Sequence, residues 1–292
     1  MLAAIDIGSN AARLLINEVK TVHNKDEFIK VNLLRIPLRL GMDVFKLGKI
    51  GTEREQMILD SMKVFGDLMK IYKIDHYRAC ATSAMRDAAN GAEIIKKVKE
   101  HSGIDIEIIS GDQEAALVFE NHVAENLDND ASYLYIDVGG GSTELTFYEN
   151  GKMRYERSFN IGTIRLLNNL VHKSDWEEMK NEIKSHILSK KSVVAIGSGG
   201  NINKVFSMSK TKEGKPMSAN YLKKLYKEIA QYSIPERMVR YNIREDRADV
   251  LEPALKIFNH VLDWADISKI YVPKISVADG LIHHMYQNLK HK

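Results

Sequence analysis

Three consecutive glycines follow an aspartate at the end of an apolar run, and these residue types in this order can bind a charged ligand. The run 133–138 is rich in β-branched and aromatic residues, which predicts a strand, and Asp137 stands near its end. The glycines at 139–141 leave the backbone N–H groups unobstructed, so the turn can form a nest for an anion. A carboxylate beside such a turn can hold a hard cation such as Mg²⁺ against the anion.

A second copy of this pattern opens the chain. The stretch 5–18 aligns without a gap on 136–149, and its Ile, Asp, Gly, Leu and final Glu recur in step. One such stretch is equally compatible with an ordinary glycine-rich hairpin. Two of them, one at the start of each half, indicate a duplicated domain that grips phosphate from both sides.

The two turns define the candidate ligands of phosphate and metal. Backbone N–H groups would surround the phosphate, hydroxyls would add donors, and guanidinium groups would bind its oxygens two at a time. The predicted metal ligands are Asp6, Asp137 and Glu144, although an isolated Asp6 is also compatible with a simple turn aspartate. The predicted phosphate-binding residues are Gly8, Ser9, Asn10, Arg13, Gly139, Gly140, Gly141, Ser142, Thr143 and Gly199.

Three candidates also have purely structural explanations. Arg86 either binds phosphate or pairs with a nearby aspartate. Gly199 lies in the segment 197–201, which either lines a phosphate site or only turns the chain from strand to helix. Read locally, Glu114 is a first-turn glutamate that the helix dipole favours, next to a capping box at 110–113.

The elements that must position these residues occur in the same order in both halves. Three extended segments form a meander, and helices and strands alternate after it. That is the plan of the ribonuclease-H-like fold, which is duplicated in the actin, Hsp70 and sugar-kinase superfamily. The meander strands are expected at 2–8, 13–19 and 28–40 in the first half, and at 133–138, 143–149 and 152–160 in the second.

The sequence therefore predicts an α/β protein made of two ribonuclease-H-like domains, a duplicated actin-like ATPase fold flanking an interdomain cleft. The domains are expected at 1–120 and 121–292, and the closing helix at about 277–290 is able to pack across the boundary. A helix that starts at the capping box is expected to run to about residue 127.

Composition bounds the class of protein. The chain has 292 residues and a net charge of +3, which gives no electrostatic footprint for DNA or other bulk nucleic acid. Cys80 is the only cysteine, so no intramolecular disulfide can form. No apolar run approaches the length of a membrane span, and Asp6 interrupts the place of a signal-peptide core. We expect a cytoplasmic protein with no membrane partner.

Five short strings of polar and small residues occur in order along nearly the whole chain. They are Asp6-x-Gly-Ser-Asn-x-x-Arg13, Ala81-Thr-Ser-Ala-x-Arg-x-Ala88, Ile109-Ser-Gly-x-x-Glu-Ala115, Asp137-x-Gly-Gly-Gly-Ser-Thr-Glu144 and Gly197-x-Gly-Gly200. Together they resemble the exopolyphosphatase/guanosine pentaphosphate phosphatase (Ppx/GppA) family. Two departures stand out: Ala11 replaces a serine that is frequent in the family, and Ala278 replaces an arginine before the acidic residue and glycine.

The resemblance implies a hydrolase of phosphoanhydrides that uses Mg²⁺, with Mn²⁺ as an alternative. Its substrate would be polyphosphate or a guanosine penta- or tetraphosphate, and the family often forms a homodimer. Glu114 would orient or deprotonate the attacking water, and Asp137 and Arg86 would complete the catalytic set. The chain is similar to the short, two-domain members, which implies a preference for short polyphosphate.

Two other functions remain open at this level. A kinase of the same superfamily would transfer phosphate from ATP to a small acceptor, and would form product only when that acceptor is present. A nucleotide-gated binding module, as actin and Hsp70 are, would need an assembly surface, and the sequence shows no obvious one.

Overall fold

The computed structural model of the protein describes residues 1–23, 25–117, 131–187, 193–273 and 276–290. The chain divides into two compact units. Unit 1 comprises Met1–Asn121 with Val277–Lys292, and unit 2 comprises His122–Ser276. The expected boundary at residue 120 lies outside the described residues, as does the end of the helix predicted to reach residue 127.

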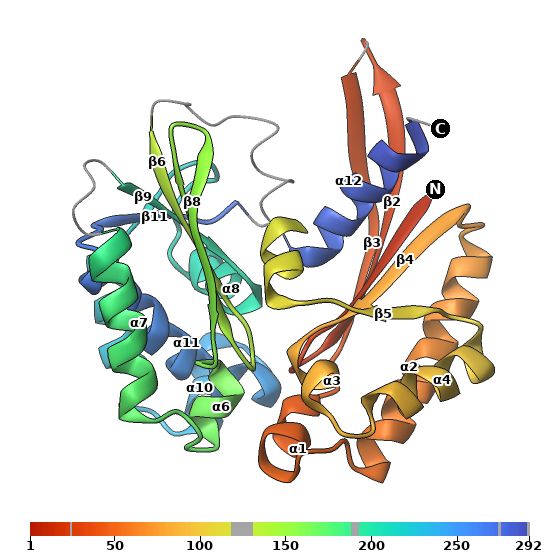
Figure 1. Ribbon diagram of the computed structural model, residues 1–292, viewed down its shortest axis with the longest axis horizontal. Coiled ribbons are helices and arrows are strands. Elements are labelled where there is room, and N and C mark those ends of the chain that lie inside the picture. The colour runs from red at the N-terminus through yellow and green to blue at the C-terminus, as the bar shows by residue number, and fades with distance from the viewer. Residues whose placement is uncertain (24, 118–130, 188–192, 274–275, 291–292) are drawn as a thin grey trace. The chain divides into compact units, whose positions relative to one another are not determined.

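Unit 1 is built on a five-stranded sheet with the order β3-β2-β1-β4-β5 (Figure 1). The first three strands form an antiparallel meander, and β4 and β5 then run parallel to β1. Parallel neighbours require a crossover, and helices provide it here. The strands are β1 (Leu2–Ile7), β2 (Ala12–Val22), β3 (Lys25–Ile36), β4 (His76–Ala81) and β5 (Ile106–Ile108).

Successive side chains of β1 point to opposite faces of the sheet, and different helices cover the two faces. Ala3 and Ile5 belong to a buried cluster with α1, α2 and α4, whereas Leu2 and Ala4 belong to another with α12. Asp6 has the parity of Leu2 and Ala4, so its side chain emerges on the α12 face. The helices are α1 (Leu40–Leu47), α2 (Thr52–Ile71), α3 (Ser83–Asp87), α4 (Gly91–Ser102) and α12 (Val277–Lys290), and residues 111–117 are also helical.

The third strand begins and ends earlier than the sequence predicts. It ends at Ile36, and Leu40 begins α1 instead of continuing the strand. Pro37 has no N–H to donate to a sheet ladder, and Arg39 adopts a left-handed conformation with φ of 53°. These two residues turn the chain into a helix that periodicity alone does not reveal.

Unit 2 contains a six-stranded sheet with the order β10-β11-β9-β6-β7-β8. Its strands β8-β7-β6-β9-β11 repeat the order β3-β2-β1-β4-β5 of unit 1, and β10 adds an edge strand. The expected fold, two ribonuclease-H-like domains, is therefore confirmed. The strands are β6 (Ser132–Val138), β7 (Thr143–Glu149), β8 (Lys152–Phe159), β9 (Val193–Ser198), β10 (Met217–Ser218) and β11 (Lys269–Tyr271).

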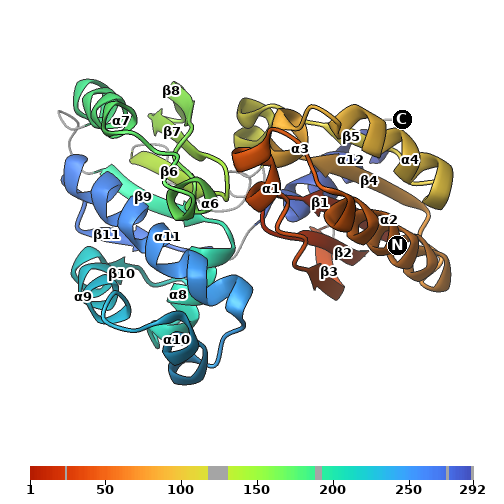
Figure 2. The same ribbon diagram turned by 90° about the horizontal axis from the view of Figure 1, so that it is seen from below.

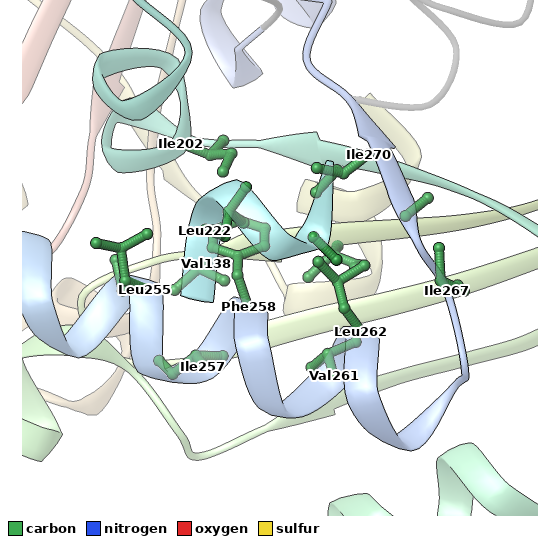
Figure 3. Close-up of a cluster of buried hydrophobic side chains, with 14 of the residues drawn as sticks. Val138, Ile202, Leu222, Leu255, Ile257, Phe258, Val261, Leu262, Ile267 and Ile270 are labelled. Atoms are coloured by element: carbon green, nitrogen blue, oxygen red, sulfur yellow. The ribbon is translucent and has the colours of Figure 1, made fainter. Parts of the chain in front are cut away.

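The core of unit 2 forms around the long helix α11 (Glu245–Trp264), which lies along the sheet (Figure 2). Phe258 of this helix is buried among aliphatic side chains, including Ile202 and Ile270 (Figure 3). The remaining helices are α6 (Thr163–Leu167), α7 (Lys173–His186), α8 (Gly200–Met208), α9 (Ala219–Ile229) and α10 (Ile234–Tyr241).

Although it is last in the chain, α12 belongs to unit 1. Its apolar side covers β1, β2 and β4, and Leu281 is completely buried there. His283 stacks on Phe28 of β3 at 3.8 Å between ring centroids, and Lys290 pairs with Asp26 at 2.7 Å. Gly280 lies against the backbone of Leu117, where a side chain would not fit.

We predict that Gly280→Ala weakens the docking of α12. An added Cβ would lie 2.1 Å from the carbonyl oxygen of Leu117, a backbone atom that cannot rotate away. The unfolding free energy should fall by about 1–3 kcal/mol in urea titrations. Gly66→Ala in α2 is the matched control, because its Cβ would lie at an ordinary 3.5 Å from Ser102. Equal stability of Gly280→Ala and wild type would contradict the close approach of the two segments.

Candidate functional site

In each unit the predicted residues gather where parallel strands end. In unit 1 the strands β1, β4 and β5 are parallel, and they are followed by Gly8, Thr82 and Ile109. In unit 2, β6 and β9 are parallel and are followed by Gly139 and Gly199. Open α/β sheets bind ligands at the carboxyl ends of their strands, because loops and helix N-termini converge there.

Asp6 is neutralised within its own hairpin. It lies directly opposite Arg13 in the β1–β2 ladder, and the guanidinium donates to its carboxylate at 2.8 Å. Asp6 is only 3% exposed. Burial raises the pKa of Asp6, Arg13 opposes that effect, and the nearby carboxylate of Asp279 adds to it. The predicted metal ligand and the predicted phosphate ligand thus form a partly buried ion pair.

The turn after β1 is fastened to the start of α1. Gly8 donates to the carbonyl of Ala11 at 3.0 Å, which closes the turn. The carbonyls of Ser9 and Asn10 accept from the N–H groups of Gly41 and Arg39, at 2.9 and 3.0 Å. In a trans peptide the carbonyl and the following N–H point in opposite directions, so the N–H groups of Asn10 and Ala11 turn away from α1.

Sequence reasoning missed the network that holds this helix start. Arg54 donates through Nε to the carbonyl of Arg39 at 3.0 Å, and its Nη1 contacts Asp43 at 2.6 Å. Asp43 also accepts from the N–H of Gly51 at 3.0 Å. Because α1 was not predicted, no sequence signal connected these residues with the turn.

Glu114 lies on the same face of unit 1 as Asp6. Its helix starts at the predicted capping box, which is confirmed by reciprocal bonds between Ser110 and Gln113 at 2.9 and 3.1 Å. Cys80, opposite Asp6 in the parallel ladder, is buried, and burial raises the pKa of its thiol well above the usual range; the carboxylates of Asp6 and Glu114 add to this. Both carboxylates are therefore electrostatic neighbours of Cys80.

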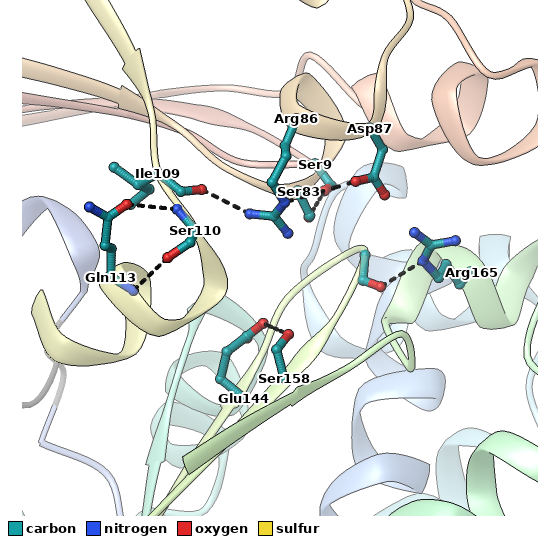
Figure 4. A network of polar contacts seen from close by, with 11 residues as sticks. Ser9, Ser83, Arg86, Asp87, Ile109, Ser110, Gln113, Glu144, Ser158 and Arg165 are labelled. Carbon is teal, nitrogen blue, oxygen red and sulfur yellow. Dashed lines mark hydrogen bonds and ion pairs between the residues drawn. The ribbon is translucent and has the colours of Figure 1, made fainter.

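Arg86 and Ser9 have partners within unit 1 (Figure 4). Arg86 on α3 donates to the carbonyl of Ile109 at 2.8 Å, and its Nε lies 3.9 Å from Asp87. The Ser9 and Ser83 hydroxyls are 2.8 Å apart and buried. These contacts tie α3 to the ends of β1 and β5. A role for Arg86 or Ser9 toward phosphate stays a prediction.

The turn after β6 in unit 2 repeats the construction of unit 1. Gly139 donates to the carbonyl of Ser142 at 2.9 Å, as Gly8 does to Ala11. The carbonyls of Gly139 and Gly140 accept from the N–H groups of Thr163 and Ile164, at 3.0 and 2.8 Å, at the start of α6. The N–H groups of Gly140 and Gly141 therefore turn away from α6. This is the arrangement that an anion nest requires.

Asp137 differs from its counterpart Asp6 in its cross-strand neighbour. Glu144 stands opposite Asp137, at the position where unit 1 has Arg13. Directly opposed residues share a face, so two carboxylates replace an ion pair. Glu144 is 4% exposed and accepts from Ser158 at 2.9 Å (Figure 4). Glu144 is buried and Asp137 is half-buried, and two like charges on one face favour a bound cation.

Gly199 and Thr143 contribute in different ways. Gly199 has φ of 100°, and a Cβ there would lie 3.0 Å from a carboxylate oxygen of Asp137, so the absence of a side chain lets the β9–α8 turn approach this carboxylate. Thr143 is completely buried, and its hydroxyl donates to the carbonyl of Ile161 at 2.5 Å. A role for Thr143 toward phosphate stays a prediction.

The string 246–249 at the start of α11, Asp-Arg-Ala-Asp, contains two buried aspartates. Asp246 and Asp249 are 7% and 6% exposed, and Arg247 donates to the side-chain carbonyl of Asn201 at 3.1 Å. Asn201 is in the first turn of α8, two residues after Gly199. The string therefore anchors the α8 end of the candidate site, a role that its sequence pattern did not reveal.

The described residues lack two kinds of feature. No group of three or more His, Cys, Asp or Glu side chains in the described part of the chain could enclose a metal ion. Among the helices that the structure describes, none is long and apolar enough to cross a membrane.

Comparison with known proteins gives consistent matches. The Ppx/GppA phosphatase family matches residues 16–289. The guanosine-5'-triphosphate,3'-diphosphate pyrophosphatase of Aeromonas salmonicida is 23% identical over 99% of this chain and 60% of its own length. Exopolyphosphatase 2 of Mycobacterium tuberculosis is 30% identical over 59% of this chain and 55% of its own. The chain spans less than two thirds of the length of the curated relatives it matches.

Solved structures match in fold. A crystal structure of an exopolyphosphatase from Cytophaga hutchinsonii superposes with a TM-score of 0.84, is 24% identical, and covers 98% of both chains. This likeness supports the fold described above, two ribonuclease-H-like domains.

We predict that Gly162→Ala displaces the turn after β6. An added Cβ would lie 2.4 Å from both the Gly140 oxygen and the Gly141 carbonyl carbon. Calorimetry should detect weaker binding of inorganic phosphate, and the unfolding free energy should fall by about 1–3 kcal/mol. Gly66→Ala again serves as the control. Unchanged phosphate affinity in Gly162→Ala would exclude this packing as a determinant of the turn.

A second prediction concerns Cys80 and pH. Its folded pKa is raised, whereas the unfolded thiol ionises at about 8.5. The contribution of this thiol to the unfolding free energy is therefore fully present below about pH 8.5. It is lost as pH rises toward the folded pKa, because only the unfolded state releases the proton. Between about pH 9 and 11, wild type should lose up to about 1.4 kcal/mol per pH unit relative to Cys80→Ala. If the unfolding free energies of wild type and Cys80→Ala change with pH in parallel, the thiol is not shielded from solvent in the folded state.

Proposed function

The chain belongs to the Ppx/GppA phosphatase family, and we propose that it hydrolyses the terminal phosphoanhydride of inorganic polyphosphate, the 5′ terminal phosphate of guanosine pentaphosphate, or both. The observation that carries the proposal is the paired construction of the two turns. Each unit presents backbone N–H groups beside an aspartate at the end of its first strand. The named activities of the relatives support these substrate classes.

Within this proposal, the turns bind phosphate oxygens through backbone N–H groups. Hydrolysis needs an aligned water and donors for the charge that develops on the phosphate. Glu114 is assigned to orient or deprotonate the water, and its half-buried position on the Asp6 face of unit 1 is compatible with this role. Arg13 and Arg86 are assigned to bind phosphate oxygens and offset their negative charge.

The residues present fit Mg²⁺, which when bound would neutralise phosphate charge. Asp137 and Glu144 supply hard carboxylate oxygens on one face of the sheet, with no basic residue opposite Asp137 in the β6–β7 ladder. Mg²⁺ commonly keeps several waters and uses one or two carboxylates, so a larger cluster among the described residues is not required. Asp6, paired with Arg13, is the weaker ligand of the proposed set.

The test of this function is phosphate release from polyphosphate and from guanosine pentaphosphate, with Mg²⁺ and with a chelator. We expect release only with the metal, and a loss of about 10²- to 10⁴-fold in kcat for Glu114→Gln. Asp112→Asn is the matched control, since it removes an exposed carboxylate from the same helical turn. Full activity of a folded Glu114→Gln would remove Glu114 from the mechanism. Phosphate transfer from ATP to an acceptor, without hydrolysis, would identify a kinase instead.

A further inference from the structure

Arg165 is a charged residue of unit 2 that the proposed mechanism does not use. It lies in α6, is partly buried, and donates through Nε to the carbonyl of Gly141 at 2.8 Å. Its other guanidinium nitrogens lie on the side away from that carbonyl (Figure 4). With Thr163 and Ile164, it completes a set in which α6 holds three consecutive glycine carbonyls.

The last of these carbonyls is the one that backbone donors of α6 do not hold. The N–H of Arg165 is directed to Gly140 at 3.3 Å, so Gly141 is reached by the guanidinium instead. The peptide between Gly141 and Ser142 is planar, and its N–H points opposite to the held carbonyl. The guanidinium therefore sets the direction of the Ser142 N–H, which is the last donor of the nest.

Unit 1 supplies an internal comparison. Asn10 is the counterpart of Gly141 in the duplication, and its carbonyl is held by the backbone N–H of Arg39 at 3.0 Å. That turn contains Ser9 and Asn10, whose side chains restrict the backbone, whereas the turn in unit 2 has three glycines. Glycine peptides reorient at little steric cost, so the freer turn needs a stronger donor. A donor with a full charge meets that need.

We propose that Arg165 is a positioning residue that fixes the Gly141–Ser142 peptide so that its N–H faces the bound phosphate. The expected effect of Arg165 on catalysis rests on the proposed function. Its expected effect on the Gly141–Ser142 peptide does not. Arg165 acts through the peptide and not by contact with substrate.

The activity test compares Arg165→Ala, Arg165→Lys and Arg154→Ala in the Mg²⁺ assay with polyphosphate. Removal of one preorganised donor typically costs 10²- to 10³-fold, so disorientation of one should lower kcat by about tenfold to a hundredfold. Added guanidinium should restore part of the activity of Arg165→Ala. The Arg165→Lys variant should be less active than wild type, because lysine lacks the planar fork of arginine. Arg154 is the control, because it is a half-exposed arginine of the same unit that pairs with Glu149 at 3.6 Å.

Hydrogen exchange tests the turn without turnover. The amides of Gly139, Thr163 and Ile164 donate across the turn, so they should exchange faster in Arg165→Ala than in wild type or Arg154→Ala. Unchanged exchange would overturn the inference even if wild type hydrolyses polyphosphate. If exchange is faster in Arg165→Ala but wild type hydrolyses neither substrate, the positioning role stands and the proposed function is wrong. A loss of activity that tracks thermal unfolding and resists guanidinium rescue would reduce Arg165 to a stabilising residue.

Discussion

The structure depends on the capture of turn carbonyls by the helix that follows each meander. In unit 1 the start of α1 holds Ser9 and Asn10, and in unit 2 the start of α6 holds the glycines 139–141. Because each peptide is planar, a carbonyl fixed on one side fixes an N–H on the other. The helix thereby satisfies its own unpaired N-terminal donors and at the same time orients the donors of the anion nest. The close contact of Gly162 with the same turn leaves little freedom for another arrangement.

The two copies share this construction but have diverged in charge. The cross-strand neighbour of the strand-end aspartate is Arg13 in unit 1 and Glu144 in unit 2. One hairpin therefore neutralises its buried carboxylate internally, whereas the other keeps two carboxylates on one face. A single difference at one register position therefore leaves the strand-end aspartate beside a cationic side chain in unit 1 and beside a second carboxylate in unit 2.

Several side chains of the predicted site form hydrogen bonds within their own unit. The Thr143 hydroxyl is used by Ile161, the Ser9 hydroxyl contacts Ser83, and Arg86 binds the carbonyl of Ile109. Each contact joins the end of one strand to a neighbouring segment. Buried polar groups need partners, and at strand ends the nearest partners are backbone carbonyls and short hydroxyls.

The sequence by itself determined the duplication, the strand-end aspartates, the glycine turns and the capping box at 110–113, because each depends on local residue order. It did not determine α1, which depends on Pro37 and on the left-handed Arg39. It also could not show that the Thr143 hydroxyl is held by Ile161 or that α12 packs in unit 1, because both depend on contacts between distant segments. Which carbonyl a guanidinium such as Arg165 reaches, and which face a closing helix covers, are set by contacts between segments far apart in the chain. Local patterns fix what a segment can form, and tertiary structure selects the partners that its polar groups then bind.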